Sequence, residues 1–107
     1  MHLTASAYSF EVLPLEACLT IVRHMGFSHV DLSGFHARGR ASVEPDAIVA
    51  DAQGEADKMK ALLDKYELVC SDFFPQFGNS HDDHSLNDPD PTVRERNHAL
   101  VRGCAHF

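Results

Sequence analysis

The sequence has 107 residues, with 9 Lys+Arg against 16 Asp+Glu for a formal net charge of −7, and 44% of its residues are hydrophobic. This length is typical of one globular domain at most. An acidic balance without a run of Lys or Arg argues against a protein that binds nucleic-acid phosphates. No stretch approaches the roughly 18–20 consecutive apolar residues of a membrane span, and the N-terminus lacks the pattern of a secretory signal. We therefore expect a cytoplasmic protein with neither nucleic acid nor membrane as a partner.

The three cysteines, Cys18, Cys70 and Cys104, are odd in number, widely spaced and set in apolar surroundings. That pattern fits buried free thiols better than a disulfide framework or a zinc knuckle. We expect the protein to work in a reducing compartment.

The first elements follow a strand, helix, strand order. Alternation of apolar and polar residues over 3–10 predicts a short strand. Pro14 then starts an apolar pattern at helical spacing, which Gly26 ends. Alternation resumes over residues 27–33 and predicts a second strand directly after the helix.

The middle of the chain combines a loop with the strongest helical pattern. Residues 34–44 are rich in Gly, Arg, His and Ser, which favours a loop. Pro45 opens a long apolar stripe that continues to Tyr66 and predicts one helix. Gly54 lies inside this stripe and costs roughly 1 kcal/mol against alanine without necessarily breaking the helix.

The last third repeats the strand and helix order. Residues 68–74 form a short apolar run closed by Pro75, as in a third strand, and residues 76–90 form a polar loop. The pattern after Pro91 predicts a third helix. Strand and helix thus alternate in units of about 30 residues, the spacing of parallel βαβ crossovers, so the fold class is α/β with parallel strands.

Three such units are few for any complete parallel architecture. A closed eight-stranded barrel takes roughly 250 residues, and an open doubly wound sheet usually has five or six strands. The sequence stops in or just after its third helical pattern. We therefore expect residues 1–107 to be a single partial domain, the N-terminal fragment of a larger α/β protein.

The pattern resembles the sugar phosphate isomerase/epimerase family of xylose isomerase-like TIM barrels. The segments that carry the resemblance are the opening strand within residues 5–10, the helix that begins at Pro14-Leu15-Glu16 and ends at Met25-Gly26-Phe27, the Gly-Phe-x-x-Val-Asp-Leu strand at 26–32, and the helix at 57–68. The resemblance implies that the chain forms the first three βα units of a (β/α)8 TIM barrel, an incomplete barrel.

The resemblance also implies an activity for the parent protein. Members of this family hold a divalent metal (Mn, Mg, Co or Zn) with Glu, Asp and His side chains. They bind a small sugar or sugar phosphate and move a proton next to its carbonyl. In the isomerases and epimerases the metal ligands come mostly from strands later than the third. The expected chain is thus the part that shapes the substrate pocket, inactive alone.

Two residues of the second strand are candidates for substrate binding. If their apolar neighbours face the helices, Asp31 and Ser33 point inward at the C-terminal end of the strand, where barrel enzymes place functional groups. A carboxylate there can accept a hydrogen bond from a sugar hydroxyl. The alternative is that Asp31 caps a loop or pairs with Arg38 or Arg40.

Three further residues complete the expected substrate-binding set. Tyr8, at the mouth of the first strand, and Phe10, just beyond it, can form an apolar wall against a sugar ring, or they can belong to the core. His36 follows the second strand and lies near the same mouth.

The densest group of possible metal ligands is His81, Asp82, Asp83 and His84. Of these, His81 and His84 are weak candidates, because polar loops usually owe such residues to turn formation and solvation. In the endonuclease IV branch of the same barrels, histidines of early strands bind zinc. By position His36 and His81 are the nearest matches.

Two alternatives remain open. One is a metal-dependent phosphodiesterase of the apurinic-site nuclease type, which the acidic balance disfavours. The other is a non-catalytic α/β assembly module that self-associates through exposed strand edges.

Overall fold

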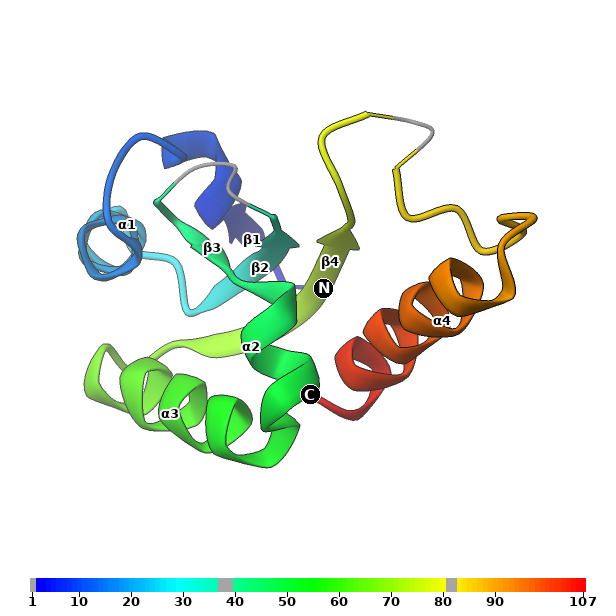
Figure 1. The fold of residues 1–107 in the computed structure, drawn as a ribbon. Helices are drawn as coiled ribbons and strands as arrows, with labels where there is room; N and C mark the ends of the chain where they lie inside the picture. Colours follow the sequence, from blue (N-terminus) through cyan, green and yellow to red (C-terminus); the bar gives the residue numbers. More distant parts are fainter. Residues whose placement is uncertain (1, 37–39, 81–82) are drawn as a thin grey trace.

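The computed structural model describes residues 2–36, 40–80 and 83–107, which fold into helices around parallel strands (Figure 1). The elements are, in chain order, β1 (Thr4–Ser6), the 3₁₀ helix η1 (Ala7–Phe10), α1 (Leu15–His24), β2 (His29–Phe35), β3 (Ser42–Val43), α2 (Pro45–Ala50), α3 (Ala52–Lys65), β4 (Val69–Gln76) and α4 (Pro91–His106). None of the helices in the described part of the chain has the length and apolar character needed to cross a membrane.

The sheet is built around β2, to which β1, β3 and β4 all pair in parallel. β4 pairs along the whole of β2, from His29 to Phe35. β1 pairs with its first residues and β3 with Ser33 and Gly34, so these two short strands share the other edge of β2. The α/β class with parallel strands is confirmed, and the sheet of the described residues is open.

The first strand is shorter than the alternation over 3–10 predicts. β1 ends at Ser6, and the chain then tightens into η1, where the backbone N–H of Glu11 donates to the carbonyl of Tyr8 at 3.1 Å. The turn buries Ala7 completely and brings the chain back toward α1. Alternating side chains do not distinguish an extended segment from one that turns, so the prediction is wrong beyond Ser6.

The second strand runs from His29 to Phe35, two residues later at each end than predicted, and the expected loop that follows contains β3. The Ser42 hydroxyl joins the two strands, because it accepts the Phe35 N–H at 2.6 Å and lies 3.2 Å from the Ser33 carbonyl. A Cβ at Gly34 would lie only 2.5 Å from Cζ of Phe73 on β4, so a larger residue here would displace that ring.

The long helix predicted from Pro45 to Tyr66 is in fact two helices, α2 and α3, separated at Asp51. Asp51 has a non-helical backbone (φ −155°, ψ 77°), and its carboxylate accepts the N–H of Gly54 at 3.0 Å. This is an N-cap bond, which satisfies one of the free donors at a helix start. The break therefore precedes Gly54, and that glycine lies in the first turn of α3.

The third predicted strand continues through Pro75 to Gln76 as β4. A proline in a strand is tolerated on an edge, where no neighbour needs its missing N–H. β4 fits that description, because among the described residues it pairs only with β2. Six of its eight residues are exposed.

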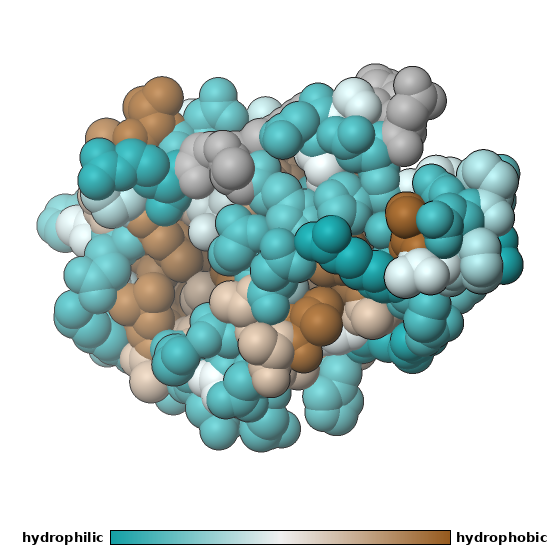
Figure 2. All heavy atoms as spheres, in the orientation of Figure 1, coloured by the Kyte–Doolittle hydropathy of each residue, from teal (hydrophilic) through white to brown (hydrophobic). Residues whose placement is uncertain are grey.

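The core lies on one face of the sheet. Val30 and Leu32 of β2 pack there with Leu19 and Val22 of α1 and with Leu63 of α3. A smaller cluster forms where α2 and α4 meet beyond β3. The surface seen in Figure 2 is largely hydrophilic with scattered hydrophobic patches, as in most folded domains.

Candidate functional site

A polar hollow of about 290 Å³ lies on the sheet face opposite the core, toward the C-terminal ends of the strands. Its carboxylates are Asp31 and Asp72, its other polar residues are Ser6, Ser33 and Gln76, its aromatic residues are Tyr8, Phe35 and Phe74, and Leu32 also contributes to its lining. The prediction that the side chains of β2 alternate between two faces is confirmed. Asp31 and Ser33 face the hollow, while Val30 and Leu32 belong to the core.

The strand register aligns the acidic residues of the polar hollow. Asp31 is the partner of Ser6 on β1 and of Asp72 on β4. Neighbouring strands are about 4.8 Å apart, so two carboxylates and a hydroxyl form a row across three strands. Such a row offers hydrogen-bond acceptors to more than one hydroxyl group of the same ligand.

Ser33 adds a polar group that the protein leaves without a partner. The residue is only 3% exposed, and its Oγ makes no hydrogen bond within the described ranges 2–36, 40–80 and 83–107. An unsatisfied buried hydroxyl costs about 1–3 kcal/mol. The Oγ is buried in this conformation, so a ligand hydroxyl in the polar hollow would offset that cost after a change of the Ser33 rotamer.

Three aromatic rings form the apolar side of the polar hollow. Tyr8 meets Phe35 edge to face at 5.1 Å between ring centroids, and Phe35 meets Phe74 in the same way at 5.9 Å. The Tyr8 side of this wall is open, since that residue is 47% exposed. Polar groups that fix orientation beside an apolar wall are typical of small-molecule sites.

Other predicted site residues lie elsewhere. Phe10 packs against the core and does not line the polar hollow. His36 also lies outside its lining, with its Nδ1 accepting the Gly78 N–H at 2.9 Å. His84 contacts Asn97 through Nδ1 at 3.1 Å and stacks on His36 at 4.7 Å. His81 lies outside the described residues.

Sequence reasoning missed Asp72, Phe74 and Gln76, which β4 contributes to the polar hollow. The signal was present, because these three residues alternate along the strand. The segment was interpreted as a continuous apolar run, and its register against Asp31 comes from pairing between residues that are about forty positions apart.

A further group of possible metal ligands brings His36, which the sequence indicates by position, together with two carboxylates that it does not indicate. Single ligand atoms of His36, Glu44 and Asp46 all lie within 4.8 Å of one another. These residues come from the end of β2 and the start of α2, outside the lining of the polar hollow.

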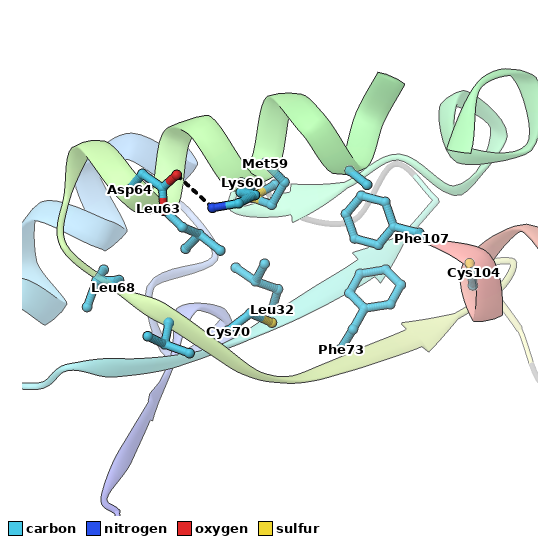
Figure 3. A pocket seen from close by; sticks show the side chains of 12 residues that line it. Leu32, Met59, Lys60, Leu63, Asp64, Leu68, Cys70, Phe73, Cys104 and Phe107 are labelled. Atoms are coloured by element: carbon cyan, nitrogen blue, oxygen red, sulfur yellow. Dashed lines mark hydrogen bonds and ion pairs between the residues drawn. The ribbon is translucent and has the colours of Figure 1, made fainter. Parts of the chain in front are cut away.

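A larger apolar groove, about 400 Å³, lies on the core side of the sheet between α3 and the end of α4 (Figure 3). The Phe73 and Phe107 rings line it in contact with each other, with centroids 4.9 Å apart, and the Lys60–Asp64 ion pair lies at its α3 side. Its lining is mainly apolar. The groove therefore offers few groups for polar recognition or chemistry.

The cysteines of the apolar groove are not activated nucleophiles. Cys104 is buried as expected, but the prediction that Cys70 is buried is wrong, because Cys70 lies on β4, which among the described residues is an edge strand. Its sulfur still packs against the groove, and this desolvation raises the pKa of the Cys70 thiol. Burial also raises the pKa of Cys104. Both groups favour the thiol over the nucleophilic thiolate.

Comparison with known proteins adds no family assignment. A scan against protein-family models finds no match to this chain, and a search of curated proteins finds no significant match. The polar hollow is the candidate site on its geometry alone.

Proposed function

We propose that this chain is the substrate-binding part of a sugar or sugar-phosphate isomerase/epimerase. In this proposal its parallel strands are the first strands of a (β/α)8 barrel, and the protein is cytoplasmic, in keeping with its three free cysteines. The observation that carries the proposal is the polar hollow at the C-terminal ends of parallel strands. Barrel enzymes place their active sites at that end.

Each side chain of the polar hollow has a role in this proposal. Asp31 and Asp72 accept hydrogen bonds from sugar hydroxyls, and bonds to a charged acceptor are the stronger kind. Ser33 exchanges a hydrogen bond with a further hydroxyl. Tyr8 and Phe74 pack against the C–H face of the ring and exclude water from one side of it.

The family that the sequence resembles uses a divalent metal, which when bound polarises the carbonyl and hydroxyl oxygens of the substrate. The ligand set implied by the resemblance includes Glu and His. Among the described residues that line the polar hollow, the side chains of ligand type are Asp31 and Asp72, both carboxylates of Asp. This set does not fit the implied metal centre, and no catalytic step is assigned to it.

The proposal is tested by calorimetric titration of the chain with unphosphorylated sugars and sugar phosphates. We expect at least one sugar to bind, and we expect Asp31→Asn to weaken that binding about tenfold or more, because a hydrogen bond to a charged group contributes about 1.5–3 kcal/mol. Asp57→Asn on α3 is the matched control and should leave binding unchanged, since Asp57 contacts Gln53 on the exposed side of α3. Absence of binding at millimolar sugar, or equal effects of the two variants, would contradict the proposal.

A second candidate function is self-association, and one observation favours it. β4 offers the backbone groups of an eight-residue edge together with apolar side chains, among them Val69 and Phe74, each 57% exposed. Long exposed edges of this kind pair with other strands. Light scattering after size exclusion should then show a dimer that Val69→Lys converts to a monomer. A wild-type chain that stays monomeric at high concentration would contradict this function.

A further inference from the structure

The His36 group differs from the polar hollow in both place and chemistry. His36 directly follows β2, while Glu44 and Asp46 flank Pro45, the buried first residue of α2. β3 pairs with β2 just before α2 and so brings the start of that helix back to the end of β2. One imidazole and two carboxylates thereby meet from segments eight and ten residues apart in the sequence.

The distances within this group suit a shared ion better than direct hydrogen bonds. His36 Nε2 lies 3.9 Å from Glu44 Oε1 and 3.7 Å from Asp46 Oδ2, beyond hydrogen-bond range. Ligands about 2.0–2.2 Å from one zinc ion are at most about 4.4 Å apart. All three ligand atoms lie within 4.8 Å of one another, so small rotations of the two exposed carboxylates complete this spacing.

The burial of His36 and the exposure of the two carboxylates also suit a bound metal ion. The His36 side chain is only 11% exposed, and its Nε2 is buried without a hydrogen-bond partner within the described part of the chain. The carboxylates, 48% and 57% exposed, leave a route for an ion to enter. An imidazole and two carboxylates are ligand types that divalent transition metals accept. Among the described residues, Arg96 is a competing cation, with its Nη2 3.8 Å from Asp46 Oδ1.

We propose that His36, Glu44 and Asp46 bind a divalent transition metal, for which Zn²⁺ is the probe of choice. Nitrogen and carboxylate oxygen are ordinary ligands of this ion, and three protein ligands leave one position for water. The proposed site is separate from the metal centre of the sugar isomerases, whose ligands come from later strands. It does not depend on the sugar-binding function of the polar hollow.

Metal binding at this site is coupled to the segment after β4. The Gly78 N–H donates to His36 Nδ1, which keeps the ring proton on Nε2, facing the two carboxylates. A metal on Nε2 replaces that proton, which moves to Nδ1, and a ligating histidine then donates from its second nitrogen. The Gly78 N–H and Nδ1–H cannot point at each other, so the Gly78 hydrogen bond breaks. The cost of this one bond is small against the free energy of a metal site.

The test is calorimetric titration of the 107-residue chain with ZnCl₂, combined with amide NMR spectra. We expect one Zn²⁺ per chain and a shifted Gly78 amide signal. His36→Gln, Glu44→Gln and Asp46→Asn should each weaken binding by about tenfold or more, the scale known for the supporting residues of metal sites. Arg96→Gln should strengthen binding, because it removes the competing cation.

Matched controls separate this site from other zinc ligands of the chain. His29→Gln alters a histidine that stacks on His2, and Cys70→Ser removes the exposed thiol. Neither should change the affinity for Zn²⁺. Absence of zinc binding, unchanged affinity in Glu44→Gln and Asp46→Asn, or an unshifted Gly78 signal would overturn the proposal. If circular dichroism shows that His36→Gln does not fold, the zinc affinities of Glu44→Gln and Asp46→Asn decide whether the proposal holds.

Discussion

The two faces of β2 differ, because one belongs to the core and the other lines the candidate site. On one face Val30 and Leu32 are almost fully buried under α1 and α3. On the other face Asp31 and Ser33 line the polar hollow. These four residues are consecutive in the sequence, so strand alternation alone separates the core from the candidate site. Substitutions on the two faces should therefore have different effects, and this difference is testable.

The largest expected effect is on the core face. Leu19→Ala removes a fully buried side chain from the cluster that covers β2. The resulting cavity should lower the free energy of unfolding by about 2–5 kcal/mol. Chemical denaturation followed by circular dichroism measures this change. A loss well under 1 kcal/mol would mean that the helices do not pack closely on the sheet.

A substitution on the face that lines the polar hollow is expected to change the free energy of unfolding in the opposite direction. Ser33→Ala removes a buried hydroxyl that has no partner among the described residues, so we expect the free energy of unfolding to rise by about 1 kcal/mol. The same substitution should weaken sugar binding, because the hydroxyl is then missing from the polar hollow. Denaturation and calorimetry on the same protein measure both changes. A destabilised variant with unchanged sugar affinity would assign Ser33 a structural role.

Thiol reactivity measures directly how well the core face is covered, although the expected effect is smaller. Iodoacetamide should modify one cysteine in the native chain, the exposed Cys70, and all three after denaturation. Desolvation raises the pKa of Cys70, so its rate should be low at neutral pH and should keep rising above the ordinary thiol pKa. Mass spectrometry over a pH series measures this. A Cys70 rate that is already maximal at pH 7 would contradict the packing of its sulfur.

The smallest expected effect concerns Asp83, which lies in the loop between β4 and α4 and outside both faces of β2. Its Oδ2 accepts the backbone N–H of Asn79 at 2.9 Å and of Ser80 at 3.1 Å, bonds that lower the pKa of Asp83. Because the folded pKa is below the unfolded one, this contribution is complete above the unfolded pKa and is lost as pH falls through the folded pKa. Asp83→Asn should therefore be slightly less stable than the wild type at pH 7. This difference in the free energy of unfolding should vanish in strong acid. A difference that stays constant with pH would contradict the role given to the Asp83 carboxylate.

The sequence predicts the strand and helix order because long periodic segments carry a strong local signal. It also predicts which face of β2 carries Asp31, since alternation needs no tertiary information. β3 was missed because two residues, Ser42 and Val43, are too few to show a period. The break at Asp51 was missed because one capping side chain outweighs an otherwise continuous apolar stripe.

The candidate sites were less predictable, because strand pairing, and not local periodicity, brings their residues together. Asp72 reaches the polar hollow through the register of β4 on β2. His36 meets Asp46 only because β3 places α2 beside the end of β2. Alternation along β4 places Asp72, Phe74 and Gln76 on one face, but local spacing predicts neither contact. The tight turn after Ser6 similarly moves Phe10 to the core while it leaves Tyr8 in the polar hollow.

The central claim, that the polar hollow binds a sugar, is tested most directly by amide NMR spectra of the chain recorded during a sugar titration. We predict that a binding sugar shifts the signals of Ser6, Asp31, Ser33 and Asp72 and leaves α1 residues such as Leu19 unchanged. Shifts confined to the apolar groove, or no shifts with any sugar or sugar phosphate, would contradict the claim.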